Sequence, residues 1–168
     1  MSLRQTIIVD ASFNFKTMTT MIGLAIHETD KPHRNGILID QIGEAYTGIP
    51  SGSGEMLAIY RALGISNERG YKMIKIKTDY NYLKKLLKTN PKQQTGKDSY
   101  GLVGAILRLS DLFDSVAFQY KPKRTNQMSH KLARTAIENN KPIFRNDLLA
   151  LCKLEASYHI GHLDMSSV

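Results

Sequence analysis

The stretch QTIIVDAS, residues 5–12, decides the fold of this chain. Thr6 to Val9 form an apolar, β-branched run that is typical of a buried central strand, and Asp10 follows it directly. A carboxylate in that place is costly unless it is paired or binds a metal ion. We therefore interpret Asp10 as the first residue of a functional site at a strand end, where ligands of α/β sheets gather.

Two more apolar runs follow, at residues 20–27 and 36–42, and both are predicted as strands. Polar residues between 14 and 19 supply the first turn, and KPHRN at 31–35 supplies the second. Three consecutive strands with short connections predict an antiparallel meander.

The pattern then changes, because SGSG at residues 51–54 ends the run of strands. The segments predicted beyond it are an amphipathic helix at 55–63, a strand at 71–78, a helix at 80–87, a polar loop at 88–99, a helix at 100–113, a strand at 115–120 and a helix at 126–138. A meander followed by alternating strands and helices predicts an α/β fold with a five-stranded mixed sheet flanked by helices.

The length of 168 residues suits one domain with a small appendage. We assign residues 1–138 to the domain. NNKP at 139–142 is interpreted as a joint, and residues 139–168 as a C-terminal extension with a helix at 145–157 and a tail. This extension is a candidate for binding a protein partner.

The chain is basic: 23 Lys and Arg against 15 Asp and Glu give a net charge of +8 and a pI near 9.6. A polyanion such as nucleic acid is the natural partner, because each neutralised phosphate releases condensed counterions. The alternative is a basic surface that serves only solubility.

Cys152 is the single cysteine, so an intrachain disulfide and a zinc site of several cysteines are both excluded. Residues 1–10 lack the apolar core of a signal peptide, and no apolar run approaches the roughly 20 residues that span a bilayer. We expect a cytoplasmic protein that does not bind membranes.

Two more acids occupy places like that of Asp10. Asp79 ends the strand at 71–78, where Ile74 and Ile76 alternate with lysines, and Glu55 begins a helix on the same face as its apolar residues. Each acid has an alternative interpretation on its own. Asp79 is also suited to capping a following helix, and Glu55 to the positive end of the helix dipole.

Taken together, three inward acids from two strand ends and one helix start predict a cluster. Clustered carboxylates repel one another unless cations neutralise them, and no Lys or Arg stands out in the adjacent motifs as a compensating charge. Hard oxygen ligands suit Mg²⁺ or Mn²⁺, and two such ions can hold the attacking and leaving oxygens of a phosphodiester.

These motifs resemble the ribonuclease H-like family, in particular type 1 ribonucleases H of the plant-type or reverse-transcriptase-associated branches. The matching segments are Asp10-Ala11-Ser12, Glu55-x-x-Ala58-x-x-x-Ala62-Leu63, Thr78-Asp79-Tyr80 and Asn126-x-x-Ser129-His130-x-Leu132-Ala133. They occur in the family's order over residues 5–137, with Tyr80 in place of the usual Ser.

The resemblance implies a two-metal endonuclease that cuts the RNA strand of an RNA–DNA hybrid. Asp10, Glu55 and Asp79 would be catalytic and would bind two Mg²⁺ or Mn²⁺ ions. His130 replaces the family's fourth acid, and the distant Argonaute relatives use either Asp or His in that role. A neutral imidazole ligates Mn²⁺ better than Mg²⁺. The alternative is that the replacement by His130 marks a site that has lost catalytic activity and only binds.

Nucleic-acid contacts are expected from Ser12 and from a basic segment beside the site, namely Lys121, Lys123, Arg124 and Asn126. The lysines of the loop at 88–99 bind phosphate or are simply solvated, and His159 and His162 are interpreted as surface residues. Two other functions stay open: an inactive module that binds nucleic acid or protein, and a nuclease of this fold that cuts junctions or single strands.

Overall fold

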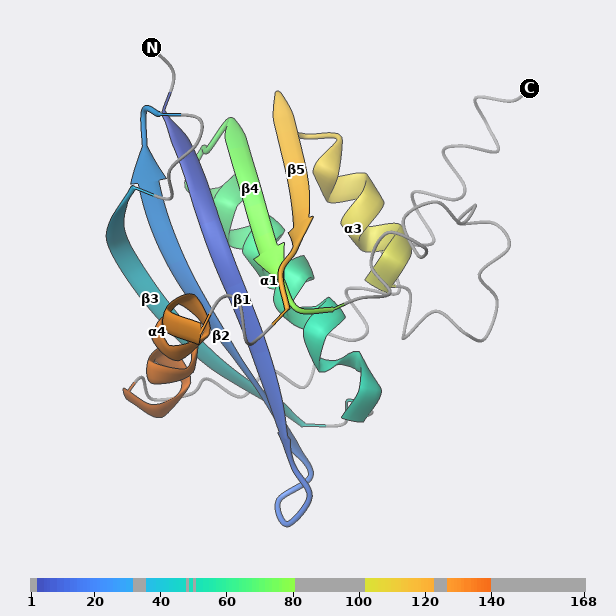
Figure 1. Ribbon diagram of the computed structural model, residues 1–168. Coiled ribbons are helices and arrows are strands. Elements are labelled where there is room, and N and C mark those ends of the chain that lie inside the picture. Colours follow the sequence, from blue (N-terminus) through green and yellow to red (C-terminus); the bar gives the residue numbers. More distant parts are fainter. Residues whose placement is uncertain are drawn as a thin grey trace, which may run out of the picture.

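The computed structural model describes residues 3–31, 36–47, 49, 51–80, 102–122 and 127–139. It contains a five-stranded sheet in the order β3-β2-β1-β4-β5 (Figure 1). The strands are β1 Arg4–Asn14, β2 Thr19–Thr29, β3 Ile37–Thr47, β4 Met73–Thr78 and β5 Ser115–Tyr120. β1, β2 and β3 pair antiparallel, whereas β1, β4 and β5 pair parallel. The predicted fold class, with its meander and mixed sheet, is confirmed.

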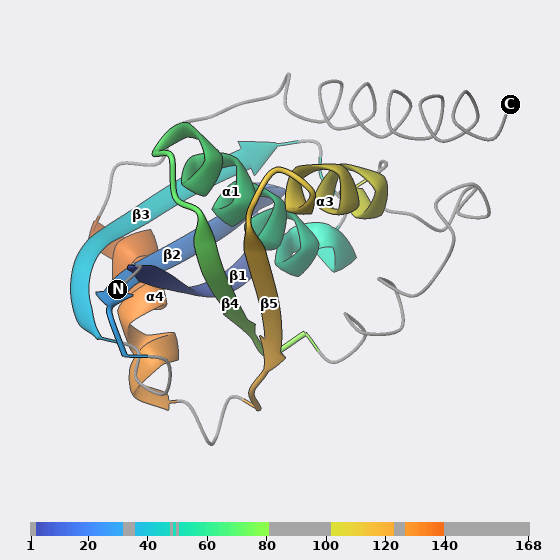
Figure 2. The same ribbon diagram turned by 90° about the horizontal axis from the view of Figure 1, so that it is seen from above.

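Helices cover both faces of the sheet (Figures 1 and 2). They are the short 3₁₀ helix η1 Ser51–Ser53, then α1 Gly54–Glu68, α3 Leu102–Ser110 and α4 Gln127–Asn139. α1 and α3 pack on one face, while α4 lies on the other face against β1, β2 and β3.

The core lies between the sheet and the pair α1 and α3. Alternate residues of β1, among them Ile7 and Val9, face α1, because side chains of a strand alternate between faces. Leu57 and Ile59 of α1 belong to the same buried cluster, and all four residues are almost completely inaccessible to solvent. Burying each such side chain contributes about 1.5–3 kcal/mol, so this layer fixes α1 on the sheet.

The prediction that α1 is amphipathic is wrong. Every residue from Met56 to Leu63 is buried, because the helix lies between the sheet and α3. Its Arg61 is compensated by Glu44 of β3: Nε donates to Oε1 at 2.7 Å and Nη2 to Oε2 at 3.1 Å. The Tyr46 hydroxyl also donates to Oε1, at 2.6 Å. Burial by itself lowers the pKa of Arg61, but these partners raise it above its ordinary value.

Two glycines bring α4 close to the sheet. A Cβ on Gly23 of β2 would lie 2.1 Å from the Ala133 carbonyl oxygen, and one on Gly43 of β3 would lie 2.3 Å from that of Ala136. Only a residue without a side chain permits this approach. Gln41 adds a hydrogen bond from Nε2 to the Leu132 carbonyl at 2.9 Å.

The predicted end of the first strand is also wrong. β1 continues past Asp10 to Asn14, because its ladder with β2 runs on to Asn14 and Thr19. The ladder between β1 and β4, however, ends at Ile8 and Lys77. Asp10 therefore lies just past the end of β4, although it is inside β1. The predicted helix at 80–87 (apart from Tyr80), the loop at 88–99 and the extension beyond 139 lie outside the described residues.

Candidate functional site

Three carboxylates predicted to form a site converge in the structure. Oxygen atoms of Asp10, Glu55 and Asp79, one from each side chain, all lie within 4.8 Å of one another. Asp10 is completely inaccessible to solvent and the other two are partly accessible. The cluster therefore combines one buried carboxylate with two that solvent can reach.

Different elements position the three acids. Asp10 comes from β1, next to Gly23 of β2 in the register, on the sheet face that α4 covers. Glu55 is in the first turn of α1, and Asp79 directly follows β4. The Thr78 hydroxyl accepts a hydrogen bond from the Tyr80 backbone N–H at 3.1 Å. This bond spans Asp79 and fixes the backbone on both sides of it.

A cation that the sequence interpretation missed lies beside the cluster. Nη1 of Arg134 on α4 is 4.0 Å from Oδ2 of Asp10, and the Arg134 side chain is about half exposed. The expectation that the motifs supply no compensating Lys or Arg is therefore wrong. The contact depends on the close approach of α4 that Gly23 allows; glycine inside a strand pattern is the sequence signal for such an approach.

The donor set suits hard divalent cations. Oxygen ligands lie 2.0–2.1 Å from Mg²⁺, so two ligands on opposite sides of one ion are about 4.2 Å apart. The observed limit of 4.8 Å is slightly wider. It is compatible with two ions about 3.5–4 Å apart, or with one ion after small side-chain rotations. The three acids repel one another at this spacing, and the half-exposed Arg134 offsets part of that repulsion.

Lysines of β4 share the face of Asp10. Lys77 pairs with Ile8 and Lys75 with Thr6 in the parallel register, and neighbours in a ladder point to the same side. Lys121 follows β5 and donates its backbone N–H to the Thr78 carbonyl at 2.9 Å. Burial lowers the pKa of Lys77, and the charges of Lys75 and Lys121 lower it further. We call Lys75, Lys77 and Lys121 the lysine row.

The remaining predicted site residues are less fully placed. Ser12 lies on β1 two residues beyond Asp10 and is partly accessible. His130 belongs to α4, four residues before Arg134 and so on the same side of that helix, but its side chain is outside what the structure describes. Lys123, Arg124 and Asn126 lie outside the described residues.

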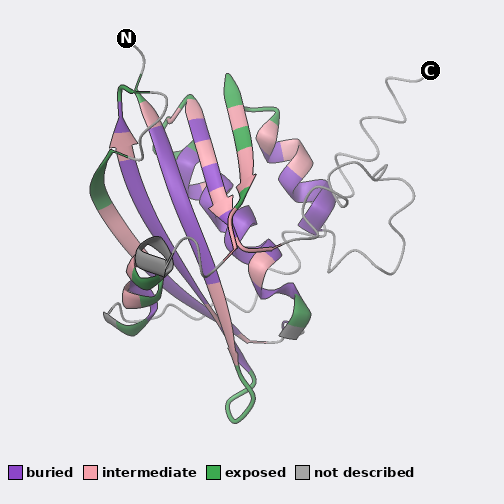
Figure 3. Cartoon of the chain, in the orientation of Figure 1, coloured by how far each residue is buried: buried purple, intermediate pink, exposed green. Residues whose placement is uncertain are grey.

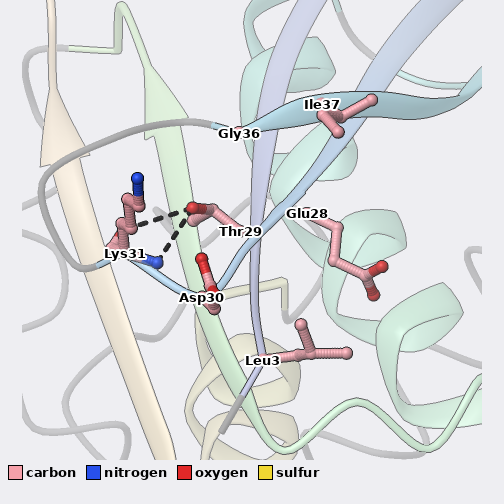
Figure 4. A pocket seen from close by; sticks show the side chains of 7 residues that line it. All are labelled: Leu3, Glu28, Thr29, Asp30, Lys31, Gly36 and Ile37. Carbon is pink, nitrogen blue, oxygen red and sulfur yellow. Dashed lines mark hydrogen bonds between the residues drawn. The ribbon is translucent and has the colours of Figure 1, made fainter. Parts of the chain in front are cut away.

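A separate pocket of about 640 Å³ lies at the other end of the sheet (Figure 4). Leu3, Glu28, Asp30 and Ile37 line it, near the start of β1 and the connection between β2 and β3. Its polar groups do not converge on one point: Glu28 accepts a hydrogen bond from Gln5 at 2.8 Å. We assign it no function.

The fold and the acid cluster define a ribonuclease H-like domain. The family model described as "Reverse transcriptase-like" matches residues 8–136, most of the chain. The chain belongs to this family, as its motifs led us to expect. No curated protein sequence matches the chain.

Solved structures support the same fold. An RNase H1 from the archaeon Halobacterium salinarum matches with a TM-score of 0.64 at 19% identity, over 82% of this chain and 99% of that one. The N-terminal RNase H domain of a Mycobacterium tuberculosis protein gives 0.64 at 14%, over 82% and 95%. LC11-RNase H1, solved with an RNA/DNA hybrid, gives 0.57 at 17%, over 80% and 96%.

Among the described residues, no helix combines the length and apolar character needed to cross a membrane.

Proposed function

We propose that this protein is a metal-dependent endonuclease that hydrolyses the RNA strand of an RNA–DNA hybrid. The observation that carries the proposal is the convergence of Asp10, Glu55 and Asp79 within 4.8 Å. A buried carboxylate together with two accessible ones is what a metal site needs, because the ions must be held firmly and still reach the substrate.

The three acids hold the metal in this proposal. Asp10 and Asp79 bind two divalent ions and Glu55 completes the set. When bound, such ions activate water and offset charge on the phosphate. The water oxygen forms a bond to phosphorus while the bond from phosphorus to the 3′ oxygen breaks. The water loses a proton and the leaving oxygen gains one, which gives a 3′-hydroxyl and a 5′-phosphate.

His130 is the proposed fourth member, as an outer ligand or a proton-transfer group. Its place on α4, one helical turn before Arg134, supports this role, because Arg134 already reaches Asp10 at 4.0 Å. Ser12, Lys121, Lys123, Arg124 and Asn126 are proposed to hold the nucleic acid.

The hybrid is the proposed substrate for two reasons. The net charge of +8 and the lysine row beside the acids favour a polyanion. A protein of the same fold, LC11-RNase H1, has been solved with an RNA/DNA hybrid.

One observation favours a second function. His130 stands where the resemblance expects an acid, and a site with fewer acids binds Mg²⁺ less strongly. The alternative is a binding module of ribonuclease H fold that does not cut.

Cleavage assays separate the two functions. Labelled hybrid, double-stranded RNA, double-stranded DNA and single strands are incubated with the protein and Mg²⁺ or Mn²⁺. We expect cuts only in the RNA strand of the hybrid, lost in EDTA and in Asp10→Asn. Asp114→Asn is the control, because that exposed acid directly precedes β5, away from the cluster. Binding of the hybrid without cleavage under every condition would support the module instead.

A further inference from the structure

The tip of the β1–β2 hairpin exposes apolar side chains to solvent. Phe15 is 75% exposed and Met18 is 61% exposed. Both belong to the connection between the two strands, which is drawn as exposed in Figure 3. Single exposed apolar residues are common, but two large ones on one tight connection form a small apolar surface. We call residues 13–18 the hairpin tip.

Hydrogen bonds hold the hairpin tip in one conformation. The Asn14 side-chain oxygen accepts the backbone N–H groups of Lys16 at 2.9 Å and Thr17 at 3.3 Å. The rings of Phe13 and Phe15 meet edge to face, with centroids 4.9 Å apart and planes at 78°. The exposed ring of Phe15 is thus supported by Phe13, so it loses little conformational freedom when it binds a partner.

Met18 keeps a large side chain where glycine is the easier choice. Its φ is +53°, in the left-handed region that glycine adopts without steric conflict. Three-residue and longer hairpin connections commonly place glycine at such a position. Met18 thus combines an unfavourable backbone conformation with an exposed apolar side chain that contributes little to the core.

The hairpin tip is connected to the acid cluster through β1. Phe15 directly follows Asn14, the last residue of β1, and is five residues beyond Asp10, which at about 3.4 Å per residue places its backbone at most roughly 17 Å from that of Asp10. The hairpin extends beyond the end of β4 (Figure 1), so the tip projects at the same end of the sheet as Asp79.

We propose that the hairpin tip binds the bases of the nucleic acid on which the acid cluster acts. Phe15 stacks on an exposed base or enters between two bases, Met18 widens the apolar contact, and Lys16 lies beside a phosphate. Aromatic stacking tolerates every base, and Phe and Met are side chains that proteins insert between base steps.

Nucleic acid fits the hairpin tip better than other occupants. The tip carries Lys16, the whole chain has a net charge of +8, and Asp10 of the acid cluster is on β1, the strand that leads into the tip. This inference rests on the proposed function for its partner, but binding can be measured without cleavage.

The experiment uses a fluorescent residue at the tip. The chain has no tryptophan, so Phe15→Trp introduces a single indole at the point of contact. The full-length variant is titrated with RNA–DNA hybrid at low salt in EDTA, where it cannot cut. Stacking should quench the indole emission in a saturable manner. Leu112→Trp is the matched control, because Leu112 is 52% exposed at a turn far along the chain, and its emission should change little.

Two further variants separate binding from folding. Phe15→Ala should weaken hybrid binding on the order of 5- to 150-fold, the range that loss of one stacked base gives. Met18→Gly should raise the melting temperature, because it relieves the positive φ, yet weaken binding. Leu112→Ala should leave affinity unchanged. A merely structural tip would instead make stability and affinity fall together.

The outcomes distinguish the two proposals. If the indole emission of Phe15→Trp is unaffected by saturating hybrid and Phe15→Ala binds as wild type does, the tip proposal is overturned. If that emission instead responds to neutral phospholipid vesicles and not to hybrid, it is overturned in favour of a membrane contact. If hybrid quenches the indole but no condition gives cleavage, the tip proposal stands and the proposed nuclease activity fails.

Discussion

Asp10 is completely buried and lies 4.0 Å from Arg134, so removing its charge has two opposing effects on the stability of the fold. Asp10→Asn loses the attraction to a half-exposed arginine, which is worth less than about 1 kcal/mol. It also relieves repulsion from two nearby carboxylates. We expect no cleavage, and a melting temperature in EDTA equal to or above that of wild type. Melting curves with and without Mg²⁺ test this, with Asp114→Asn as control; a large drop in EDTA would mean that Asp10 is structural.

His27 on β2 gives the fold a pH dependence. Burial lowers its pKa below 6.5 and the charge of Lys77 lowers it further, against a hydrogen bond with Ala25. Below about pH 6.5 the unfolded chain therefore gains a proton before the folded chain does. Stability should fall with decreasing pH from there, by at most about 1.4 kcal/mol per pH unit, until the folded chain is protonated too. Thermal melts across pH should show a shallower decline for His27→Gln; parallel curves would contradict this.

The proposed role of His130 can be tested through the choice of metal ion. If it is the fourth ligand, Mn²⁺ should support cleavage at least as well as Mg²⁺, because imidazole binds Mn²⁺ more readily. His130→Ala should lose most activity, and His130→Asp should shift the preference towards Mg²⁺. Rates with each ion measure this. Wild-type rates in His130→Ala would remove His130 from the site, and activity in His130→Asp alone would make this chain a binding module.

At the scale of elements, β4 presents its lysines beside the acid cluster. The charges of Lys75 and Lys121 act on Lys77, so the row is a concentration of positive charge that a phosphate would relieve. Replacing Lys75 and Lys77 with Ala should weaken binding to all sequences alike. It should also reduce the slope of log affinity against log salt by about two. Titrations at several salt concentrations measure the slope, with the exposed Lys72→Ala as control. An unchanged slope would mean that Lys75 and Lys77 do not contact phosphates.

The contact between α4 and the sheet depends on glycine. A Cβ on Gly43 would lie 2.3 Å from the Ala136 carbonyl, whereas one on Gly52 meets nothing within 4 Å. Gly43→Ala should therefore destabilise the fold by about 1–3 kcal/mol through overpacking, and Gly52→Ala should be nearly neutral. Denaturant unfolding measures both. Equal stability of the two variants would show that α4 packs more loosely than the structure has it.

For the molecule as a whole, the succession of strands and helices along the chain, the antiparallel meander and the mixed sheet could be predicted from local patterns. Ile74 and Ile76 alternate with lysines, and β4 does bury one side. The convergence of the three acids was also predictable, because two follow apolar strand residues and one begins an apolar helix. What failed depended on distant parts of the chain. Arg61 can be buried only because Glu44, on another element, pairs with it. Arg134 lies near Asp10 only because α4 packs closely against the sheet.

The length of β1 was hidden for the same reason. The prediction ended the strand at Val9 because a charged residue, Asp10, follows it, whereas the ladder with β2 carries β1 on to Asn14. When a strand continues beside one neighbour after its other neighbour has ended, its own sequence does not show where that neighbour ends.

That geometry restricts how the hairpin can vary. Every residue added to a strand turns all those beyond it to the opposite face. From Asp10 outward, β1 and β2 can therefore lengthen or shorten without inverting the tip only in matched steps of two residues, each about 7 Å. The reach of the tip is a discrete quantity, so homologous chains should differ in it by whole steps, with few intermediate lengths.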